Sequence, residues 1–532
     1  MTDNTATPST VTGTADHGLQ RTIGWKGAFW IASGVPALVL FSVGSIAATI
    51  GTPSVLVWTV SVVLGLVQCL TYAEIAGMYP QKSGGASVYG AMAWLPYSKF
   101  IAPVSVWCNW LAWSPVLTIG ASLAAGYVLT ALFPADAAIN TWSLSLVDLG
   151  FLKDGLAIRL NAQFVIAVAF LLLVFALQHH GILRAARVQM IVGIAVLVPL
   201  VVVGVVPLLT GDVVSTSFAP FAPLSGAWDL DGWTLFAGGL FLAAWSAYAF
   251  ETAICYTREL KDPGRDTVKA IVSAGLVCLL IYTLVPFSFQ GALGVERLLT
   301  DPIVAGTGVA SAMVDMVGGG AVIGNLLTVM LILALLLTIM TTMAGSSRTL
   351  YQGSLDGWLP KYLGKANKHG APTRAMWTDL AFNLVLLLLS DTVFVLAAST
   401  VCYMIFNFLN LNAGWLHRID NRDAHRPWRA PTALIAIGGI LGFGNALLLG
   451  WGAAVWGPGA LWTGLVFAAL IVPVFLFRHY GRDKGTFPPS MYEGPEGTAV
   501  APVRRAGVLP YLTIAGGITM VVVGQVLSHL AG

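Results

Sequence analysis

Residues 233–269 read WTLFAGGLFLAAWSAYAFETAICYTRELKDPGRDTVK, and the fold can be worked out from this stretch. It begins as an apolar helix from Trp233 to Trp245, loses the helical pattern over residues 246–250, and continues with a carboxylate, Glu251. The stretch is long enough to span a bilayer, which takes roughly 20 apolar residues. An ionisable group inside such a span costs about 3 kcal/mol unless it faces a cavity or a partner. We interpret Glu251 as part of a functional site; the alternative is a protonated carboxyl group bonded to a neighbouring helix.

The composition of the whole chain agrees with a membrane protein. Of the 532 residues, 57% are hydrophobic and 10% are charged, whereas roughly a quarter are charged in soluble domains. The charges cluster between long apolar runs, which is typical of a polytopic all-α membrane protein. The net charge of +3 predicts no nucleic-acid partner, and the five cysteines lack the spacing of metal ligands. Residues 1–23 lack the basic-then-apolar order of a signal peptide and are predicted to be a disordered cytoplasmic tail.

Thirteen apolar runs are candidates for membrane spans, so we expect about 12–13 transmembrane helices. They lie near residues 27–50, 55–79, 101–133, 161–178, 188–210, 233–256, 270–293, 321–347, 375–390, 392–416, 432–455, 458–477 and 508–530. Only Ser390 and Asp391 separate the ninth run from the tenth, which predicts a tight turn there.

Lysine and arginine placement predicts the orientation, because these residues favour the cytoplasmic side. With a cytoplasmic N-terminus, the alternation of spans leaves only Lys153, Arg159 and Arg297 of the 27 basic residues outside. A wrong number of spans would scramble this separation. The thirteenth run then places the C-terminus outside.

The first span carries an interruption that matches the one in the sixth. Residues Ser33-Gly34-Val35-Pro36-Ala37 combine glycine and proline, which break the backbone hydrogen-bond ladder. Paired breaks in two halves of a membrane protein point to a binding site at membrane mid-depth. We therefore predict a core over residues 24–420 built as a five-plus-five inverted repeat (about 24–210 and 233–418), with peripheral helices over residues 430–532. A simple proline kink is the alternative for the first break.

Three further motifs together resemble the amino acid–polyamine–organocation (APC) superfamily of transporters over about residues 25–420. The first is Tyr72-Ala73-Glu74, then Pro80 and Ser83-Gly84-Gly85-Ala86-Ser87-Val88-Tyr89; the second is Glu251 with Glu259-Leu260-Lys261-Asp262-Pro263-Gly264-Arg265; the third is Ser347-Arg348-Thr349-Leu350-Tyr351 with Asp356-Gly357-Trp358-Leu359-Pro360, followed by Pro372. Any one of these motifs alone would be weak. The resemblance implies the leucine-transporter-like fold with broken first and sixth helices, and a small-molecule substrate.

The resemblance also implies where a substrate would bind. Free backbone N–H groups and a helix dipole at the first break suit an anion, and the resemblance places a substrate carboxylate there, with its amino group at the carbonyls of the sixth span. Trp245 matches a tryptophan that walls the site in related transporters, and by spacing Asn109 and Trp113 should face the same cavity. The predicted binding residues are Ser33, Gly34, Val35, Pro36, Ala37, Asn109, Trp113, Trp245, Ser246, Tyr248 and Ala249.

One departure from the family concerns proton coupling. Some proton-coupled relatives carry a lysine in the fifth span, whereas residues 187–207 contain none. Glu251 is then the leading proton-coupling candidate, because burial in a bilayer favours the protonated form of a carboxyl group. Exchange of one substrate for another remains open. Glu74, at the end of the second span beside Lys82, is either a gate ion pair or, as we favour, an interfacial charge.

These observations predict a secondary active transporter of an amino acid in the plasma membrane, with no cofactor and no metal. The same fold could carry a polyamine or another organic amine instead. A membrane-embedded enzyme is less well supported, because the spans hold no zinc motif, no Ser/His/Asp set and no nucleotide-binding loop. A channel would require repeated polar residues along a pore rather than two broken helices.

Overall fold

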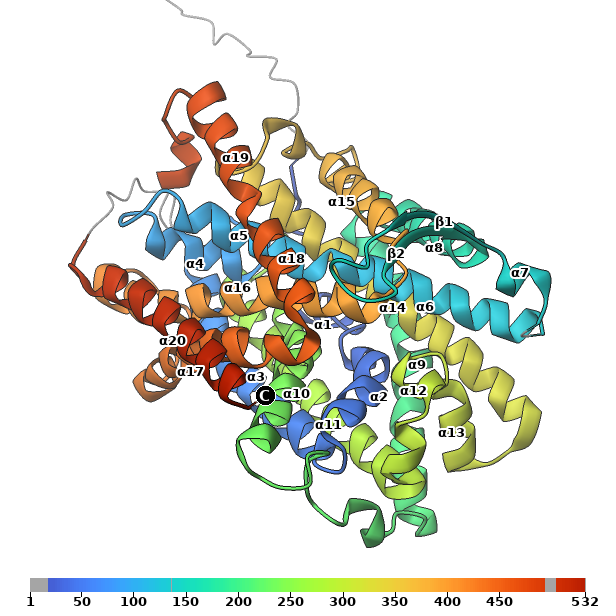
Figure 1. The fold of residues 1–532 in the computed structure, drawn as a ribbon. Helices are drawn as coiled ribbons and strands as arrows, with labels where there is room; N and C mark the ends of the chain where they lie inside the picture. Colours follow the sequence, from blue (N-terminus) through green and yellow to red (C-terminus); the bar gives the residue numbers. More distant parts are fainter. Residues whose placement is uncertain (1–17, 135, 493–503, 532) are drawn as a thin grey trace, which may run out of the picture.

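The computed structural model describes residues 18–134, 136–492 and 504–531, so the predicted tail lies outside the described residues as far as residue 17. Within the described part, twelve helical segments are long and apolar enough to cross a membrane. The segments pack side by side as one bundle (Figure 1). The prediction of a polytopic, mainly helical membrane protein is therefore confirmed.

The crossing segments follow the predicted runs closely. In the first half they are α1 (Trp25–Ile31) with η1 (Pro36–Leu38) and α2 (Val39–Ile50); α3 (Ser54–Gly77); α5 (Ile101–Trp113) with α6 (Pro115–Leu132); α8 (Ala162–His179); and α9 (Ile182–Thr210). After these come α10 (Leu230–Ala247) with η3 (Ala249–Ile254) and η4 (Thr257–Glu259); α11 (Pro263–Leu298); α14 (Gly320–Leu355); α16 (Thr392–Asp420); α17 (Thr432–Trp451) with η6 (Ala453–Trp456); α18 (Pro458–Ala469) with α19 (Ile471–Leu476) and the π-helical η7 (Phe477–Arg482); and α20 (Leu509–Ala531).

Shorter elements connect the crossing segments. They are α4 (Ala86–Trp94), α7 (Ala138–Thr141), β1 (Ser143–Asp148), β2 (Ala157–Asn161), η2 (Ser215–Phe218), α12 (Asp301–Val304), α13 (Val309–Val317), η5 (Lys361–Leu363), α15 (Thr373–Leu386) and η8 (Pro489–Tyr492).

The predicted ninth span corresponds to α15, which has only 14 residues and would be about 21 Å long. Its two ends nevertheless lie beside the two ends of α8. Near the start of α15, the Asn367 side chain donates to the carbonyl of His179. Just beyond its end, the Leu388 carbonyl accepts from the backbone N–H of Arg159. Because α8 is one of the twelve crossing segments, α15 with its end turns extends along a segment of spanning length, and we expect a thirteenth crossing there.

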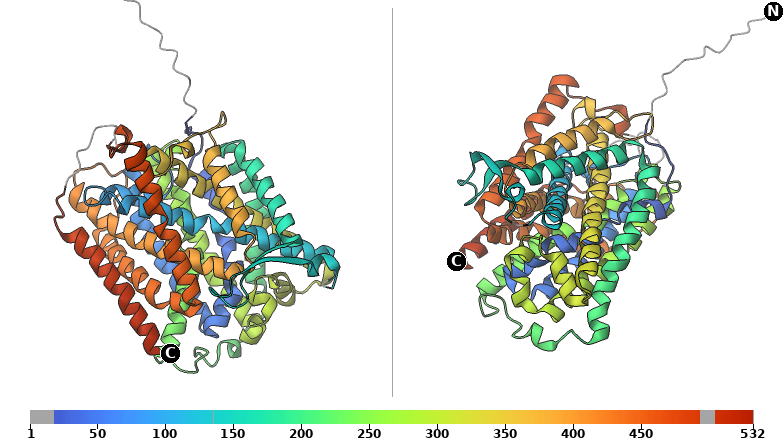
Figure 2. Two further views of the ribbon diagram at one scale, coloured as in Figure 1. Left: turned by 45° about the horizontal axis from the view of Figure 1, so that its top comes forward. Right: turned by 90° about the vertical axis from the view of Figure 1, so that its right-hand side faces the viewer.

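A small antiparallel hairpin, β1–β2, stands at the edge of the bundle (Figure 2). Its strands pair from Ser143 with Asn161 to Asp148 with Ala157. The sequence analysis did not predict it, although residues 143–146 alternate serine and leucine; all six side chains of β1 are exposed. Ser390 donates its backbone N–H to the Ala157 carbonyl, so the hairpin extends onto the tight turn between α15 and α16.

Both predicted helix breaks are present. The first α-helix ends at Ile31 and regular α-helix resumes at Val39, after a short 3₁₀ turn that begins at Pro36. The sixth span is regular up to Ala247, so its break begins at Tyr248, two residues later than Ser246. Beyond it the chain continues as 3₁₀ turns and does not return to α-helix before the exit. The organisation into two inverted repeats stays a prediction.

Candidate functional site

The two helix breaks meet at one buried side chain, Tyr282 of α11. Its hydroxyl oxygen lies 2.9 Å from the carbonyl oxygen of Val35 in the first break and 3.1 Å from that of Ser246 beside the second. A carbonyl only accepts, so the single hydroxyl hydrogen is shared between the two segments. Trp58 packs edge-on against the Tyr282 ring, with 5.4 Å between the ring centroids. The sequence analysis missed Tyr282; the pointer to it was one hydroxyl-bearing aromatic residue midway along an apolar span.

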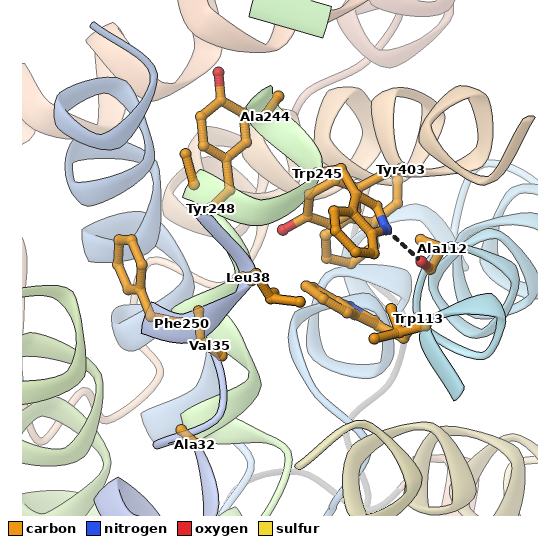
Figure 3. Close-up of a cluster of buried hydrophobic side chains, with 14 of the residues drawn as sticks. Ala32, Val35, Leu38, Ala112, Trp113, Ala244, Trp245, Tyr248, Phe250 and Tyr403 are labelled. Carbon is orange, nitrogen blue, oxygen red and sulfur yellow. Dashed lines mark hydrogen bonds between the residues drawn. The ribbon is translucent and has the colours of Figure 1, made fainter. Parts of the chain in front are cut away.

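Three large aromatic side chains and Leu38 gather beside the breaks (Figure 3). The Trp245 indole N–H donates to the Ala112 carbonyl at 3.2 Å, which fixes the sixth span against α5. The Trp113 and Tyr403 rings meet edge-to-face with centroids 5.3 Å apart. All three rings are buried. Trp113 and Trp245 were predicted site residues, whereas Tyr403 comes from α16 and was missed.

Glu251 lies on η3, immediately after the second break, and its side chain is fully buried. One carboxylate oxygen, Oε1, accepts from the Trp113 indole N–H at 3.1 Å. The other oxygen, Oε2, has no hydrogen-bond partner among the residues that the structure describes. A buried oxygen without a partner is costly, and it marks a place where a proton or a ligand group can bind.

The Ser-Gly-Gly motif positions the segment that carries Glu251. Gly84 and Gly85 adopt φ angles of 104° and 88°, which L-residues with a side chain rarely adopt, and α4 begins directly after them. The Gly84 N–H donates to the Cys255 carbonyl at 3.0 Å, and the Tyr89 hydroxyl donates to the Ile254 carbonyl at 2.9 Å. A Cβ atom on Gly85 would lie 2.9 Å from the Cys255 sulfur. The motif therefore holds η3 in place through close backbone contact.

The first break is bonded to two threonines of α14. The Gly34 N–H donates to Thr341 Oγ1 at 3.2 Å, and Thr338 Oγ1 donates to the Gly34 carbonyl at 3.0 Å. A Cβ atom on Gly34 would lie 2.7–2.8 Å from backbone and side-chain atoms of α14. The Gly34 N–H, which we expected to be open to an anion, thus has a protein partner here. Glycine is required at this position for close packing against α14.

The other predicted residues of the first break are buried around it. Ser33 Oγ donates to the Trp30 carbonyl at 2.6 Å, on the side of the chain that faces Gly193 of α9. Pro36 begins η1, and Ala37 packs in the same apolar cluster as residues of α6 and α14. The carbonyl group of Val35 accepts the hydrogen bond from Tyr282.

The remaining predicted residues lie on the sixth span and on α5. Ala249 is buried, and Tyr248 packs against Gly65 of α3, where a Cβ atom would lie 2.7 Å from the tyrosine ring. Asn109 lies one turn before Trp113; its Oδ1 accepts from Thr349 Oγ1 at 3.0 Å, while its Nδ2 has no partner among the described residues. Trp113 and Asn109 therefore follow the same side of α5, but only Trp113 contacts Glu251.

Buried ion pairs close one face of the bundle, which we call the basic face after Lys82, Arg348 and Arg418. The Arg348 guanidinium binds both carboxylate oxygens of Glu259, at the exit of the sixth span. Lys82 Nζ contacts Asp356 Oδ1 at 2.5 Å. The side chains of both pairs are at most 3% exposed. Breaking such a pair leaves an uncompensated buried charge, so each pair firmly joins the segments that carry its two residues.

Glu74 is not the interfacial charge that we favoured, nor does it pair with Lys82. Its carboxylate is buried and accepts from Arg418, from Arg426 and from the backbone N–H of Ala430. The arginines come from the end of α16 and the loop after it, so spacing along the sequence could not reveal the pairing. Among the described residues, no group of three or more His, Cys, Asp or Glu is placed to hold a metal ion.

Comparisons with known proteins identify the family of the chain. A family model described as amino acid permease matches residues 23–476. The chain is 24% identical to polyamine transporter PUT1 of Oryza sativa subsp. japonica over 425 residues, which covers 77% of this chain and 71% of the relative. It is 21% identical to the branched-chain amino acid permease BcaP of Lactococcus lactis over 475 residues (86% and 94%). It is 24% identical to the glutamate/serine transporter AimA of Bacillus subtilis over 415 residues (73% and 69%).

Proposed function

Because the chain belongs to the amino acid permease family, within the APC superfamily that its motifs resemble, we propose that it is a secondary transporter that moves an amino acid by alternating access around the centre between the two helix breaks. The observation that carries this proposal is the meeting of both breaks at Tyr282; five residues after Ser246 on the same span, Glu251 has a buried oxygen with no partner among the described residues. Broken helices supply unpaired backbone groups at membrane depth without exposing them to lipid. The substrate carboxylate binds at the first break and the amino group at the carbonyls of the sixth span.

We assign the structure to an occluded state. The side chains at the centre are buried, and the Arg348–Glu259 and Lys82–Asp356 pairs cover it on the basic face. We propose that the protein lies in the plasma membrane; the positive-inside rule favours a cytoplasmic basic face with the N-terminus inside. Opening toward the cytoplasm then requires these pairs to separate or to move together.

Glu251 is the group whose protonation couples to transport in this proposal. It follows the break by a few residues, hence within about two helical turns of a bound ligand. Its Oε2 atom accepts no hydrogen bond from the described residues, so a proton can bind there without displacing a donor. Exchange of one substrate for another, without net proton movement, is the alternative mode.

A short, neutral amino acid suits the centre best. Trp113, Trp245 and Tyr403 fill the space beside the breaks, and Trp113 occupies one oxygen of Glu251. A polyamine or organic amine is the second candidate, because the same aromatic rings could form a cage for an ammonium group. The resemblance to a relative named as a polyamine transporter favours keeping this candidate.

Purified protein in liposomes tests the function and the substrate together. We expect saturable uptake of a labelled neutral amino acid, and stronger competition from other neutral amino acids than from arginine, lysine or putrescine. Stronger competition by putrescine would replace the amino acid with an amine in the same mechanism. No uptake or exchange of any amino acid or amine would reject the transporter assignment.

The pH dependence of uptake tests the role of Glu251. Wild-type uptake should rise as the external pH falls, whereas Glu251→Gln keeps the shape, removes the titration and should make uptake nearly independent of pH between about 5 and 8. Glu296→Gln is the matched control: this glutamate is exposed near the C-terminal end of α11, and the variant should keep the wild-type pH profile. A wild-type profile in Glu251→Gln would make Glu251 a structural hydrogen-bonding group.

A further inference from the structure

A second carboxyl group is buried in the bundle, away from the helix breaks. Asp379 of α15 is fully buried, and its oxygens contact three side chains on two other helices. Oδ1 accepts from the Trp110 indole N–H at 2.8 Å and lies 2.5 Å from Ser114 Oγ. Oδ2 lies 2.5 Å from Ser346 Oγ of α14. None of these partners is a cation.

The charged groups on the elements packed against α15 are engaged elsewhere or lie at its ends. The titratable residues on α14, α6, α8, η5 and α15 itself, besides Asp379, are Arg348, Tyr351, Tyr127, His179, Lys361, Tyr362 and Arg374. Arg348 is paired with Glu259, and Lys361 with Asp483. Within the described ranges, no lysine, arginine or histidine forms an ion pair with Asp379.

A count of hydrogens shows which form of Asp379 fits. Ser346 Oγ lies 2.8 Å from the Thr342 carbonyl oxygen as well as 2.5 Å from Asp379 Oδ2. A hydroxyl has one hydrogen, and a carbonyl can only accept. If Ser346 donates to Thr342, the hydrogen in the shorter contact must come from Asp379.

The second oxygen of Asp379 agrees with this count. Asn383 Nδ2 donates to Ser114 Oγ at 2.8 Å, which leaves the Ser114 hydrogen for Asp379 Oδ1. Oδ1 then accepts twice, from Ser114 and from Trp110. In the neutral acid each hydrogen is used once, whereas the ionised form would place a full charge among neutral donors at membrane depth.

We propose that Asp379 is a second proton-binding site, separate from Glu251, which holds its proton on Oδ2 and donates it to Ser346. The site reaches the first helix break through α14. Ser346 donates to Thr342, the neighbour of Thr341, which accepts from the Gly34 N–H. Release of the proton would withdraw the Ser346 hydroxyl from Thr342 and place a charge against α14. The proton is thus linked to the helix that holds the first break.

Infrared spectroscopy of the reconstituted full-length protein tests the proposal without any substrate, so its failure and that of the proposed function are distinguishable. At about pH 7 the wild type should show a carboxylic acid C=O band that is absent from Asp379→Asn and retained in Glu251→Gln. Asp391→Asn is the matched control: Asp391 contacts Lys153 and should contribute no acid band. Identical acid bands in the wild type and Asp379→Asn would overturn the proposal.

A second variant keeps the test decisive if Asp379→Asn does not fold. Ser346→Ala removes the acceptor of the proposed O–H bond and should shift the Asp379 band to higher frequency; an unmoved band would contradict the proposal. The oxygen-rich cluster could instead hold a sodium ion. Loss of the acid band when sodium chloride replaces potassium chloride would show that Na⁺ displaces the proton, and would overturn a site that binds protons alone.

Discussion

Glu251 and Asp379 are both fully buried carboxyl groups, and both accept an indole N–H from α5, from Trp113 and Trp110 respectively. The tryptophans are three residues apart and so lie on neighbouring positions of one helix face. Glu251 stands on 3₁₀ turns beside a helix break and has one oxygen without a described partner. Asp379 stands in a regular helix, and both its oxygens are engaged. Glu251 therefore has an oxygen that can take up a new partner without breaking a contact, whereas Asp379 can release its proton only by changing its contacts with α5 and α14.

The largest expected effect is a difference in thermal stability between the alanine variants of Asp379 and Glu251. Asp379→Ala leaves the Trp110 N–H and the Ser114 hydroxyl without their acceptor and removes the contact with Ser346, and each orphaned group costs about 1–3 kcal/mol. Glu251→Ala orphans only the Trp113 N–H. Thermal unfolding in detergent should therefore show a much larger loss for Asp379→Ala, while Glu251→Ala folds but does not transport.

Asp379→Asn is the matched control for this comparison, because an amide can still accept from Trp110 and donate to Ser346. It should unfold close to the wild-type temperature. Equal losses for the two alanine variants would mean that the Asp379 contacts contribute no more to stability than the single bond of Glu251.

Gly34→Val tests the connection between the two regions through α14. The valine side chain would meet the backbone of α14, and overpacking of this kind costs about 1–3 kcal/mol. We expect a lower unfolding temperature and loss of substrate binding in a scintillation proximity assay, with insertion into the membrane retained. Gly444→Val, at a helical glycine with open space around it, should leave both measurements unchanged. Binding at wild-type affinity in Gly34→Val would show that the first break does not depend on this contact.

Tyr282→Phe tests the hydroxyl contact that links the two breaks, with a smaller expected loss of stability. It removes one shared hydroxyl bond, worth about 1 kcal/mol, and leaves the ring in place. We expect nearly normal stability but a changed uptake rate, because the segments lose their common partner. The matched control is Tyr127→Phe, which also removes a hydroxyl bonded to a carbonyl, that of Gly306. Equal effects of the two variants on uptake would argue against a special role for Tyr282.

The smallest effect is expected at a carboxylate on the surface. The Arg505 guanidinium donates to Asp423 at 3.0 Å and holds the pKa of this exposed carboxyl group below its ordinary value. A lowered folded-state pKa adds stability above the unfolded value of about 3.9 and loses it as the pH falls through the folded value. Solvent screens this pair, so Asp423→Asn should cause at most a slight loss at neutral pH and low salt, and none in acid. A large loss in a thermal shift assay at physiological salt would contradict this.

The sequence predicted the membrane spans and the two breaks, because these depend on local patterns; it also singled out Trp113, Trp245 and Glu251, which lie buried beside the breaks and whose roles stay predictions. Run length, proline and glycine, and an isolated charge can all be read within one segment. It did not predict Tyr282, Tyr403 or Asp379, since their roles arise from helices that are distant along the chain. The prediction for Glu74 was wrong for the same reason: its partners Arg418 and Arg426 follow it by more than three hundred residues. The sequence also could not show that Gly34 packs against α14, because the glycine and proline that break a helix do not indicate which other helix lies beside the break.

The start of the first span is joined to the exit of the sixth by backbone hydrogen bonds. The N–H groups of Thr22 and Ile23 reach the Glu259 carbonyl, and Lys261 donates back to Ile23. These contacts form a short parallel bridge between Ile23 and Leu260. The residue at which a shortened variant begins therefore decides whether these hydrogen bonds can form. A chain that starts after Ile23 would keep the sequence of every described helix and lack the backbone hydrogen bonds that tie the two broken segments together.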